Sequence, residues 1–234
     1  MKKLKRLICG ASVLAMTATG AYAADLAPEP MLGPDWSGFY AGIGLGGFGS
    51  RNKLVYDPVN LGSVKPFGFS GGGFLGYNFG YENFVFGIEG DIYANTGKKD
   101  RFGTISDAAG NAVAVRARLK DKMSYSIRGR LGYAAGNFMP YITGGWQGMQ
   151  QRVSFGPPGN TSGKSKSMSG YTIGGGVEWL ASGWLADDVL PGAPTFRVEY
   201  RYSDYGRNTW NLGPYSLRTK NKSNQFIFGA AWKF

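Results

Sequence analysis

The sequence contains no histidine, and its single cysteine is Cys9. Cys9 lies in a segment that we expect to be removed, so the mature chain is predicted to have neither residue. Disulfides and thiolate metal sites are then excluded, and zinc would lack its two favoured ligand types. Ser-His-Asp and Cys-His catalytic arrangements cannot be built. Paired carboxylates or Ser and Lys could still serve, but we find no such cluster. We therefore predict no enzyme, no catalytic residue and no metal site.

Long hydrophobic runs and helical periodicity are also missing. From residue 36 onward no apolar run reaches the roughly 18 residues of a membrane helix. Windows of about 11 residues show no convincing repeat of about 3.6 residues, which a helix would give. Glycine, with 39 residues, and aromatic side chains dominate instead. We expect an all-β protein.

The N-terminal residues predict export. A basic start is followed by an apolar run over residues 7–18 and an Ala-Tyr-Ala cleavage sequence that ends at Ala23. This organisation is typical of a secretory signal peptide, with a retained amphipathic helix as the alternative. We predict a signal peptide at residues 1–23, a proline-rich periplasmic spacer at residues 24–35, and one β-barrel domain at residues 36–234.

Alternation with a period of two recurs along the rest of the chain, which predicts strands. Eight segments show it: residues 36–49, 67–79, 84–95, 123–133, 139–151, 169–180, 195–202 and 224–234. Their lengths suit the roughly 9–11 residues with which a tilted strand crosses a bilayer.

The first segment also contains Gly42, Gly44 and Gly47 in the spacing G-x-G-x-x-G. This spacing indicates a dinucleotide-binding loop only where a helix follows a strand in a βαβ unit. No helical pattern follows here. We interpret the stretch as a strand with one apolar face and one face of small residues.

The two faces of the segments favour a membrane barrel over a soluble sandwich. In the seventh segment, for example, Val198 and Tyr200 alternate with Glu199 and Arg201. Aromatic residues lie near the segment ends, and the opposite face carries glycine and charges of both signs, as in outer-membrane barrels. The fifth segment is ambiguous, because Tyr141 with Thr143 and Ile142 with Trp146 compete for the outer face.

The connections alternate between short turns and long polar loops. Residues 80–83 and 134–138 are short, as periplasmic turns should be. Residues 181–194 form a longer turn with Asp187 and Asp188, which we interpret as a solvated turn rather than a metal pair. The pattern predicts an eight-stranded antiparallel transmembrane β-barrel with short periplasmic turns and long extracellular loops.

The chain ends on Phe234, with apolar residues at every second position before it. Such an ending resembles the signal by which outer-membrane proteins reach the barrel-assembly machinery. Other motifs are WSGFYAGIGLG, FGIEGDI, PYITGG and VEYRYSDYG. Together they resemble the small alphaproteobacterial outer-membrane β-barrel proteins, which include RopB-type surface proteins and hemin-binding proteins. The resemblance implies a monomeric or weakly associating barrel in the outer membrane of a Gram-negative bacterium, and says little about a ligand.

Charge is divided unevenly along the chain, whose net charge is +11. The long loops at residues 50–66, 96–122, 152–168 and 203–223 hold 17 Lys and Arg against 5 Asp and Glu. Nucleic acid would also attract such cations, but an exported barrel rarely meets it. Lipopolysaccharide, dense in phosphate and carboxylate, surrounds such loops and pairs well with Lys and Arg.

The largest cationic cluster lies in residues 96–122, where we predict an anion-binding site. Its residues are Lys98, Lys99, Arg101, Arg116, Arg118, Lys120 and Lys122. The anion would be a lipopolysaccharide phosphate or, if hemin is bound, a heme propionate. Iron ligation would then fall to a tyrosine such as Tyr56 or Tyr215. Arg116 and Arg118 alternate with apolar residues, so we expect a strand hairpin beyond the membrane whose cations face one side.

A second set of charges lies on the inward face of the predicted strands. Its residues are Glu89, Asp91, Arg128, Arg130, Glu178, Arg197, Glu199 and Arg201. Because eight strands enclose an interior that side chains just fill, mutual pairing is one reading and a narrow aqueous passage is the other. We predict a structural, envelope-stabilising surface protein, with a hemin-binding receptor or a small-solute porin as alternatives.

Overall fold

The computed structural model describes residues 34–56, 59–106, 110–157, 161–181, 194–212 and 215–234. At some strand positions beside the gaps only the backbone is described. The predicted signal peptide and nearly all of the predicted spacer lie outside these residues. No helix in the described ranges is long and apolar enough to cross a membrane.

The described chain consists of antiparallel strands. They are β1 (Gly38–Tyr56), β2 (Val59–Val64), β3 (Phe67–Tyr81), β4 (Phe84–Asn95), β5 (Lys98–Ser106), β6 (Ala112–Tyr133), β7 (Phe138–Gly156), β8 (Ser162–Leu180), β9 (Thr195–Leu212) and β10 (Tyr215–Lys233).

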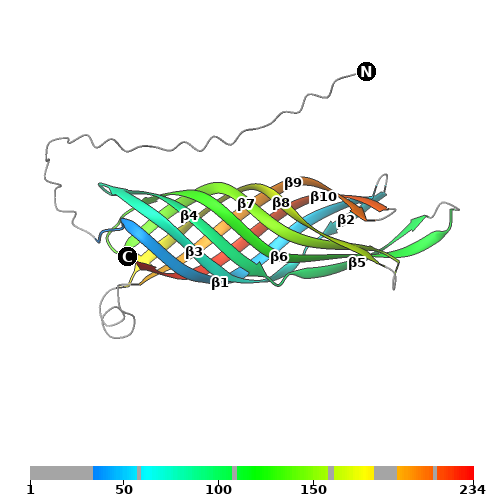
Figure 1. The fold of residues 1–234 in the computed structure, drawn as a ribbon, viewed down its shortest axis with the longest axis horizontal. Helices are drawn as coiled ribbons and strands as arrows, with labels where there is room; N and C mark the ends of the chain where they lie inside the picture. Colours follow the sequence, from blue (N-terminus) through cyan, green and yellow to red (C-terminus); the bar gives the residue numbers. More distant parts are fainter. Residues whose placement is uncertain (1–33, 57–58, 107–109, 158–160, 182–193, 213–214) are drawn as a thin grey trace, which may run out of the picture. The chain divides into compact units, whose positions relative to one another are not determined.

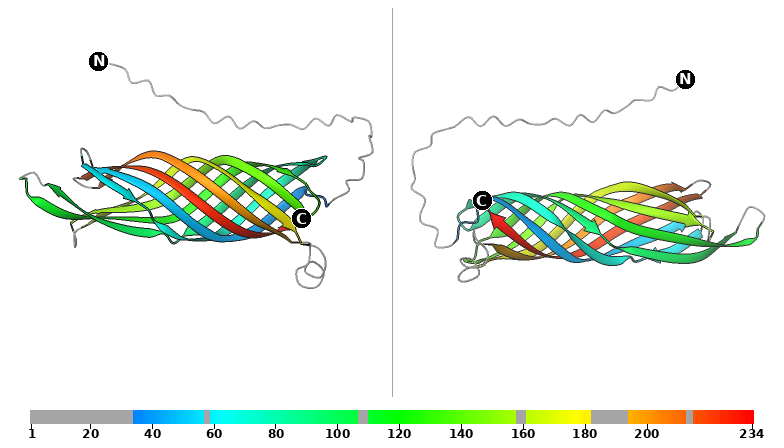
Figure 2. Two further views of the ribbon diagram at one scale, coloured as in Figure 1. Left: turned by 180° about the vertical axis from the view of Figure 1, so that it is seen from behind. Right: turned by 60° about the horizontal axis from the view of Figure 1, so that its bottom comes forward.

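Eight of these strands form a closed ring (Figures 1 and 2). The ring runs β1-β3-β4-β6-β7-β8-β9-β10, and β10 pairs with β1 along most of its length. The predicted all-β barrel is therefore confirmed. The other two strands, β2 and β5, pair with the outer parts of β1 and β6. β2 lies in a segment predicted as loop, whereas the β5–β6 hairpin agrees with the strand hairpin expected within residues 96–122.

Apolar side chains cover the outside of the barrel, as the alternation predicted. Ile173 and Val198 point outward, whereas Thr172 and Glu199 are buried inside. The ambiguous fifth segment, now part of β7, turns Ile142 outward with 62% of its surface exposed. Trp146 shares this outer face, and Tyr141 and Thr143 lie inside.

The glycines of the G-x-G-x-x-G stretch make room for aromatic rings inside the barrel. A Cβ atom at Gly42 would lie 2.4 Å from the ring of Phe74, and one at Gly44 would lie 2.5 Å from the Tyr93 hydroxyl. β1 continues through this stretch without a turn into a helix. The motif is a strand lining, as we predicted.

Strand lengths differ from the prediction at one end only. We call the end with the ring's two termini the turn end, and the opposite end the hairpin end. At the turn end each strand boundary falls within two residues of the predicted one. At the hairpin end most strands continue beyond the predicted limit. β6, for instance, begins at Ala112 instead of residue 123, and β9 ends at Leu212 instead of residue 202.

The ring opens into two sheets at the hairpin end. β8 pairs with β9 only from Tyr171 onward, so residues 162–170 have no partner strand on that side. One sheet continues β5-β6-β7-β8 and the other β9-β10-β1-β2. Two cations bridge the seams, because Lys166 Nζ donates to the Thr209 carbonyl at 3.3 Å and Arg101 Nη1 to the Ser63 carbonyl at 3.4 Å.

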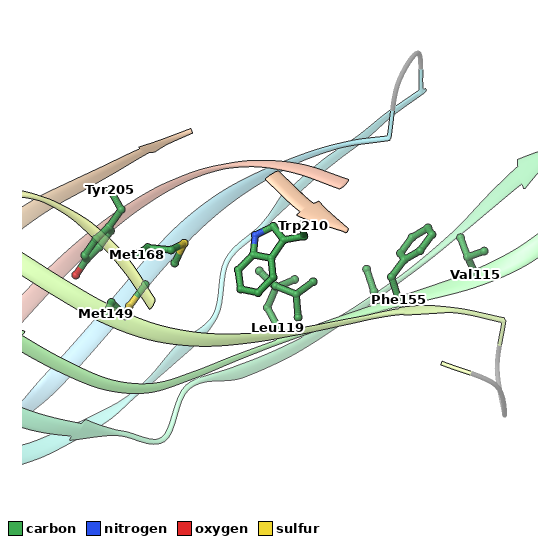
Figure 3. Packing of buried hydrophobic residues seen from close by; sticks show 9 residues of the cluster. Val115, Leu119, Met149, Phe155, Met168, Tyr205 and Trp210 are labelled. Atoms are coloured by element: carbon green, nitrogen blue, oxygen red, sulfur yellow. The ribbon is translucent and has the colours of Figure 1, made fainter. Parts of the chain in front are cut away.

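An apolar cluster fills the space between these two sheets (Figure 3). Its buried members are Val115, Ala117, Leu119, Met149, Val153, Phe155, Met168, Tyr205 and Trp210. They come from β6, β7, β8 and β9. The hairpin end thus has a hydrophobic core of its own.

Candidate functional site

The eight charged residues predicted to face inward meet in one buried network. Glu89 on β4 contacts Arg128 on β6 and Arg197 on β9, and accepts a hydrogen bond of 2.9 Å from the Tyr40 hydroxyl. Its carboxylate is 3% exposed in side-chain surface. One carboxylate therefore neutralises two arginines from opposite walls of the barrel.

A second layer of the network lies beside the first. Arg128 reaches Asp91 at 3.0 Å and Glu199 at 2.6 Å. Arg201 contacts the same two carboxylates at 3.1 and 2.8 Å. These four side chains are no more than 1% exposed. The layer therefore links three strands without access to solvent.

Arg130 and Glu178 complete the set at the turn end of the network. Their closest nitrogen and oxygen atoms are 2.7 Å apart, and Thr195 donates to the other Glu178 oxygen at 2.8 Å. The structure brings all eight predicted residues together, with four arginines against four carboxylates. Buried charges of this kind are stable only when paired and hydrogen-bonded.

Aromatic side chains that the sequence analysis did not single out hold these arginines in place. The Arg197 guanidinium lies 3.4 Å from the ring centre of Phe74, and that of Arg130 lies 4.2 Å from the ring centre of Tyr141. The Tyr141 hydroxyl donates to Glu199 at 2.8 Å. The alternation along β3 could have revealed that Phe74 faces inward, whereas the alternation around Tyr141 was ambiguous.

Apolar layers close the interior on both sides of the network. Trp36, Val85 and Met139 pack together at the turn end, and the cluster described above fills the hairpin end. A void beside Gln147 and Met149 has a volume of about 10 Å³, which is about what a single water needs. In the described residues the charge network thus lies between two buried apolar layers.

The predicted anion cluster lies on the β5–β6 hairpin, and the structure divides it. Lys98 pairs with Lys120 across the hairpin, on the outward face that Arg116 and Arg118 share. Lys99 and Arg101 pair with Leu119 and Ala117 and so lie on the opposite face. Lys122 is the extra residue of a bulge. The hairpin itself is as predicted, but the expectation that its cations face one side is wrong for Lys99 and Arg101.

Asp100 neutralises part of the outward face of this hairpin. It lies between Arg116 and Arg118 and accepts hydrogen bonds from both, at 2.7 and 3.0 Å from Arg118. These bonds lower the pKa of Asp100 from 3.8 to about 2. Two of the predicted anion-binding arginines therefore already have an anion.

Three other sequence predictions lie outside what the structure describes. Asp187 and Asp188 lie within residues 182–193, which the structure does not describe. The side chains of Tyr56 and Tyr215 are not described either. Within the described ranges no group of three or more His, Cys, Asp or Glu residues could hold a metal ion. No residue is assigned to a cofactor.

Known proteins resemble this chain over its whole length. The 25 kDa outer-membrane immunogenic protein of Brucella melitensis is 31% identical over 243 residues, covering 100% of both chains. The 22 kDa outer membrane protein of Rhizobium leguminosarum bv. viciae is 31% identical and covers 85% of this chain and 78% of its own. Among solved structures, Neisserial surface protein A is 20% identical with a TM-score of 0.41, over 85% of this chain and 98% of its own.

Residues 11–234 match the family described as "Outer membrane protein beta-barrel domain". This match spans the closed ring and the buried charge network. The chain belongs to this family of β-barrel proteins in the outer membrane of Gram-negative bacteria.

Proposed function

We propose that this protein stabilises the cell envelope as a structural surface protein, and that its basic extracellular strands contact lipopolysaccharide or another anionic ligand. The division of charge carries this proposal. Charges inside the barrel pair with each other, whereas the outward face at the hairpin end carries an excess of cations such as Lys98 and Lys120. Since β-barrels of this family place short turns in the periplasm, the hairpin end is the extracellular end.

The outward cations at the hairpin end lie where lipopolysaccharide, an anionic glycolipid, is expected. Lys98, Lys120 and Arg152 occupy neighbouring positions on β5, β6 and β7, and all three are exposed. Like charges directly opposite each other destabilise a sheet. A bridging phosphate would remove that repulsion and would make charge-assisted hydrogen bonds with each cation.

A porin role is the first alternative, and the filled interior argues against it. The network residues are buried, and apolar layers lie on both sides of them. A hemin-binding role is the second alternative and rests on the family resemblance. It would place heme propionates on the β5–β6 hairpin, and a Soret-band titration of the purified protein with hemin tests it.

The ends of the ring support a proposal about assembly and oligomeric state. The pairing of β1 with β10 leaves the ring without a free edge, which supports a monomer. Phe234, 84% exposed, donates its backbone N–H to Phe39 at 2.9 Å. We propose that the barrel-assembly machinery recognises this terminus, so that deletion of Phe234 leaves protease-sensitive protein in the periplasm.

A gene deletion with complementation tests the proposed function. The deletion is expected to increase sensitivity to detergent and to large antibiotics, and to leave the uptake of small solutes unchanged. Complementation with Lys98→Gln/Lys120→Gln/Arg152→Gln should restore resistance only in part. Slower solute uptake with an intact detergent barrier would favour the porin alternative instead.

A further inference from the structure

A second cationic cluster lies on the opposite side of the extracellular end, where β1 pairs with β10. Arg51 is directly opposite Lys222, and Lys53 is directly opposite Lys220. All four belong to the outward face of their strands. This cluster was not predicted from the sequence. Its two residues on β1 are more than 160 positions from its two residues on β10, and the pairs adjoin only because the ring closes.

These four side chains line a surface hollow. Its volume is about 180 Å³, and Arg51, Lys53, Lys220 and Lys222 border it. One water occupies roughly 30 Å³ in the liquid, so the hollow has room for a group of several heavy atoms. Among the described side chains, the ones that border this space are all cations.

Little negative charge within the described residues opposes the cluster. Lys222 Nζ lies 3.4 Å from Asp204 and 5.5 Å from the ring centre of Tyr202. Asp204 is already bound by the Gly206 N–H at 2.9 Å. No carboxylate of the described part of the chain forms an ion pair with the other three cations. Four neighbouring cations with one carboxylate repel each other unless an anion is present.

The position of the cluster relative to the apolar belt indicates where that anion comes from. Phe226, Gly47 and Phe69 occupy one row across β10, β1 and β3, and the next row contains Phe67. The three phenylalanines are exposed on the outer surface. Aromatic girdles mark the boundary between hydrocarbon and head groups in outer-membrane barrels. Arg51 and Lys222 lie in the row directly beyond Phe67, at the level of lipid phosphates.

We propose that Arg51, Lys53, Lys220 and Lys222 form a binding site for the lipid A phosphate of lipopolysaccharide. The phosphate enters the hollow from the lipid side, with its acyl chains against the phenylalanine girdle below. The site rests on the proposed contact with lipopolysaccharide and gives it a location separate from the β5–β6 hairpin. Charge-assisted hydrogen bonds from several cations to one phosphate provide the affinity.

The test compares two variants that each lose four cations. The site variant is Arg51→Gln/Lys53→Gln/Lys220→Gln/Lys222→Gln. The hairpin variant, which removes the contact proposed above together with Arg118, is Lys98→Gln/Arg118→Gln/Lys120→Gln/Arg152→Gln. The probe is bisphosphorylated lipid A, titrated in detergent into the full mature barrel freed of lipopolysaccharide. The site variant is expected to lose affinity roughly ten-fold and to show a flatter salt dependence, and the hairpin variant, whose contact contributes the smaller share, to lose less than about three-fold.

Further arms separate the sources of the phosphate. Lipid A without phosphates should bind the wild type as weakly as bisphosphorylated lipid A binds the site variant. Inorganic pyrophosphate should bind weakly to both. Equal affinity for pyrophosphate and lipid A would overturn the lipid as the source.

The two hypotheses can also fail separately. If only the hairpin variant loses affinity, lipopolysaccharide contact at the hairpin stands and this site is wrong. If both variants bind as the wild type does, both hypotheses are wrong.

Folding is checked by heat-modifiable migration, and Lys53→Gln/Lys220→Gln serves if the fourfold variant does not fold. In detergent without lipid A, the fourfold or the twofold site variant should melt at the same temperature as the wild type or higher, because repulsion between the cations is relieved. A lower melting temperature would contradict the proposal.

Discussion

The membrane level and the extracellular end of this barrel are arranged in opposite ways. At the level of the apolar belt, Ile173 and Val198 face outward and charged residues such as Arg128 face inward. At the extracellular end, Leu119 and Trp210 face inward and cations such as Lys120 face outward. The same strands run through both regions. The difference shows that the surrounding solvent, lipid in one region and water in the other, decides which face of a strand is apolar.

Two bulges lie where the arrangement reverses. In β6 the register with β7 shifts at Lys122, and in β9 the register with β10 shifts near Gly206, whose φ is 65°. Each extra residue changes which positions face inward. In β6 odd-numbered residues such as Leu119 face inward on the extracellular side of the bulge, and even-numbered residues such as Arg128 face inward on its membrane side.

The largest expected effect comes from removing a charge of the membrane-level interior. Glu89→Gln leaves Arg128 and Arg197 without their shared carboxylate, so we expect a loss of about 3–5 kcal/mol in the free energy of unfolding. A urea titration in lipid vesicles measures it. Glu82→Gln in the exposed β3–β4 turn is the control. A stable Glu89→Gln barrel with increased ion conductance would indicate a water-filled passage.

The apolar interior of the extracellular end should be less costly to weaken, because it can open locally. Leu119→Ala is expected to destabilise the two sheets by about 2–5 kcal/mol, depending on how far the cavity collapses. Limited proteolysis of intact cells should then cut the β5–β6 hairpin faster. Lys120→Ala, one residue away and outward, should leave the rate unchanged. Equal cleavage of both variants would mean that no hydrophobic core holds the sheets together.

On β8 an arginine can be introduced at one outward position that faces lipid and at another that faces water. Ile173→Arg places a cation on the lipid face between Tyr171 and Trp179, and should cost about 2–4 kcal/mol. Ser167→Arg on the same face of β8, beyond the belt, should cost about 0–1 kcal/mol. Unfolding titrations in lipid vesicles compare the two. Similar losses would place the belt boundary elsewhere.

The smallest effect concerns Asp100 on the β5–β6 hairpin. Asp100→Asn frees Arg116 and Arg118, and anion affinity of the hairpin should rise by about two- to three-fold. The folded pKa of Asp100 is lowered from 3.8 to about 2. Its pairing is therefore present above its ordinary pKa and is lost as the pH falls through about 2. The ratio of the Asp100→Asn affinity to the wild-type affinity should therefore stay constant between about pH 8 and pH 4, whatever the anion's own titration. A ratio that falls towards one within this range would show that Asp100 is not paired.

The sequence predicted the membrane level of the barrel well and the extracellular end poorly. Alternation and aromatic residues located the strands, because every strand that crosses the lipid must have an apolar outer face. Beyond the belt this rule no longer applies, so residues 203–212 were interpreted as loop, and residues 112–122 as part of a long loop that contains a strand hairpin. Neither the bulge at Lys122 nor the pairing of Arg51 with Lys222 leaves a local signal, since both depend on register between strands. The alternation along the strands predicted which charged residues face inward. It could not predict which of them pair with each other.

A spin-label accessibility scan along β6 tests the reversal most directly. Apart from Cys9 the chain has no cysteine, so single cysteines can be introduced cleanly at residues 112–133 of protein in lipopolysaccharide-containing bilayers. Odd positions from 123 to 133 should be accessible to oxygen in the lipid, and even positions from 114 to 120 to a water-soluble nickel complex. Positions 115, 117 and 119 should be accessible to neither. An alternation that continues without reversal at Lys122, or access of the nickel complex to Leu119, would contradict a closed barrel with an apolar extracellular core.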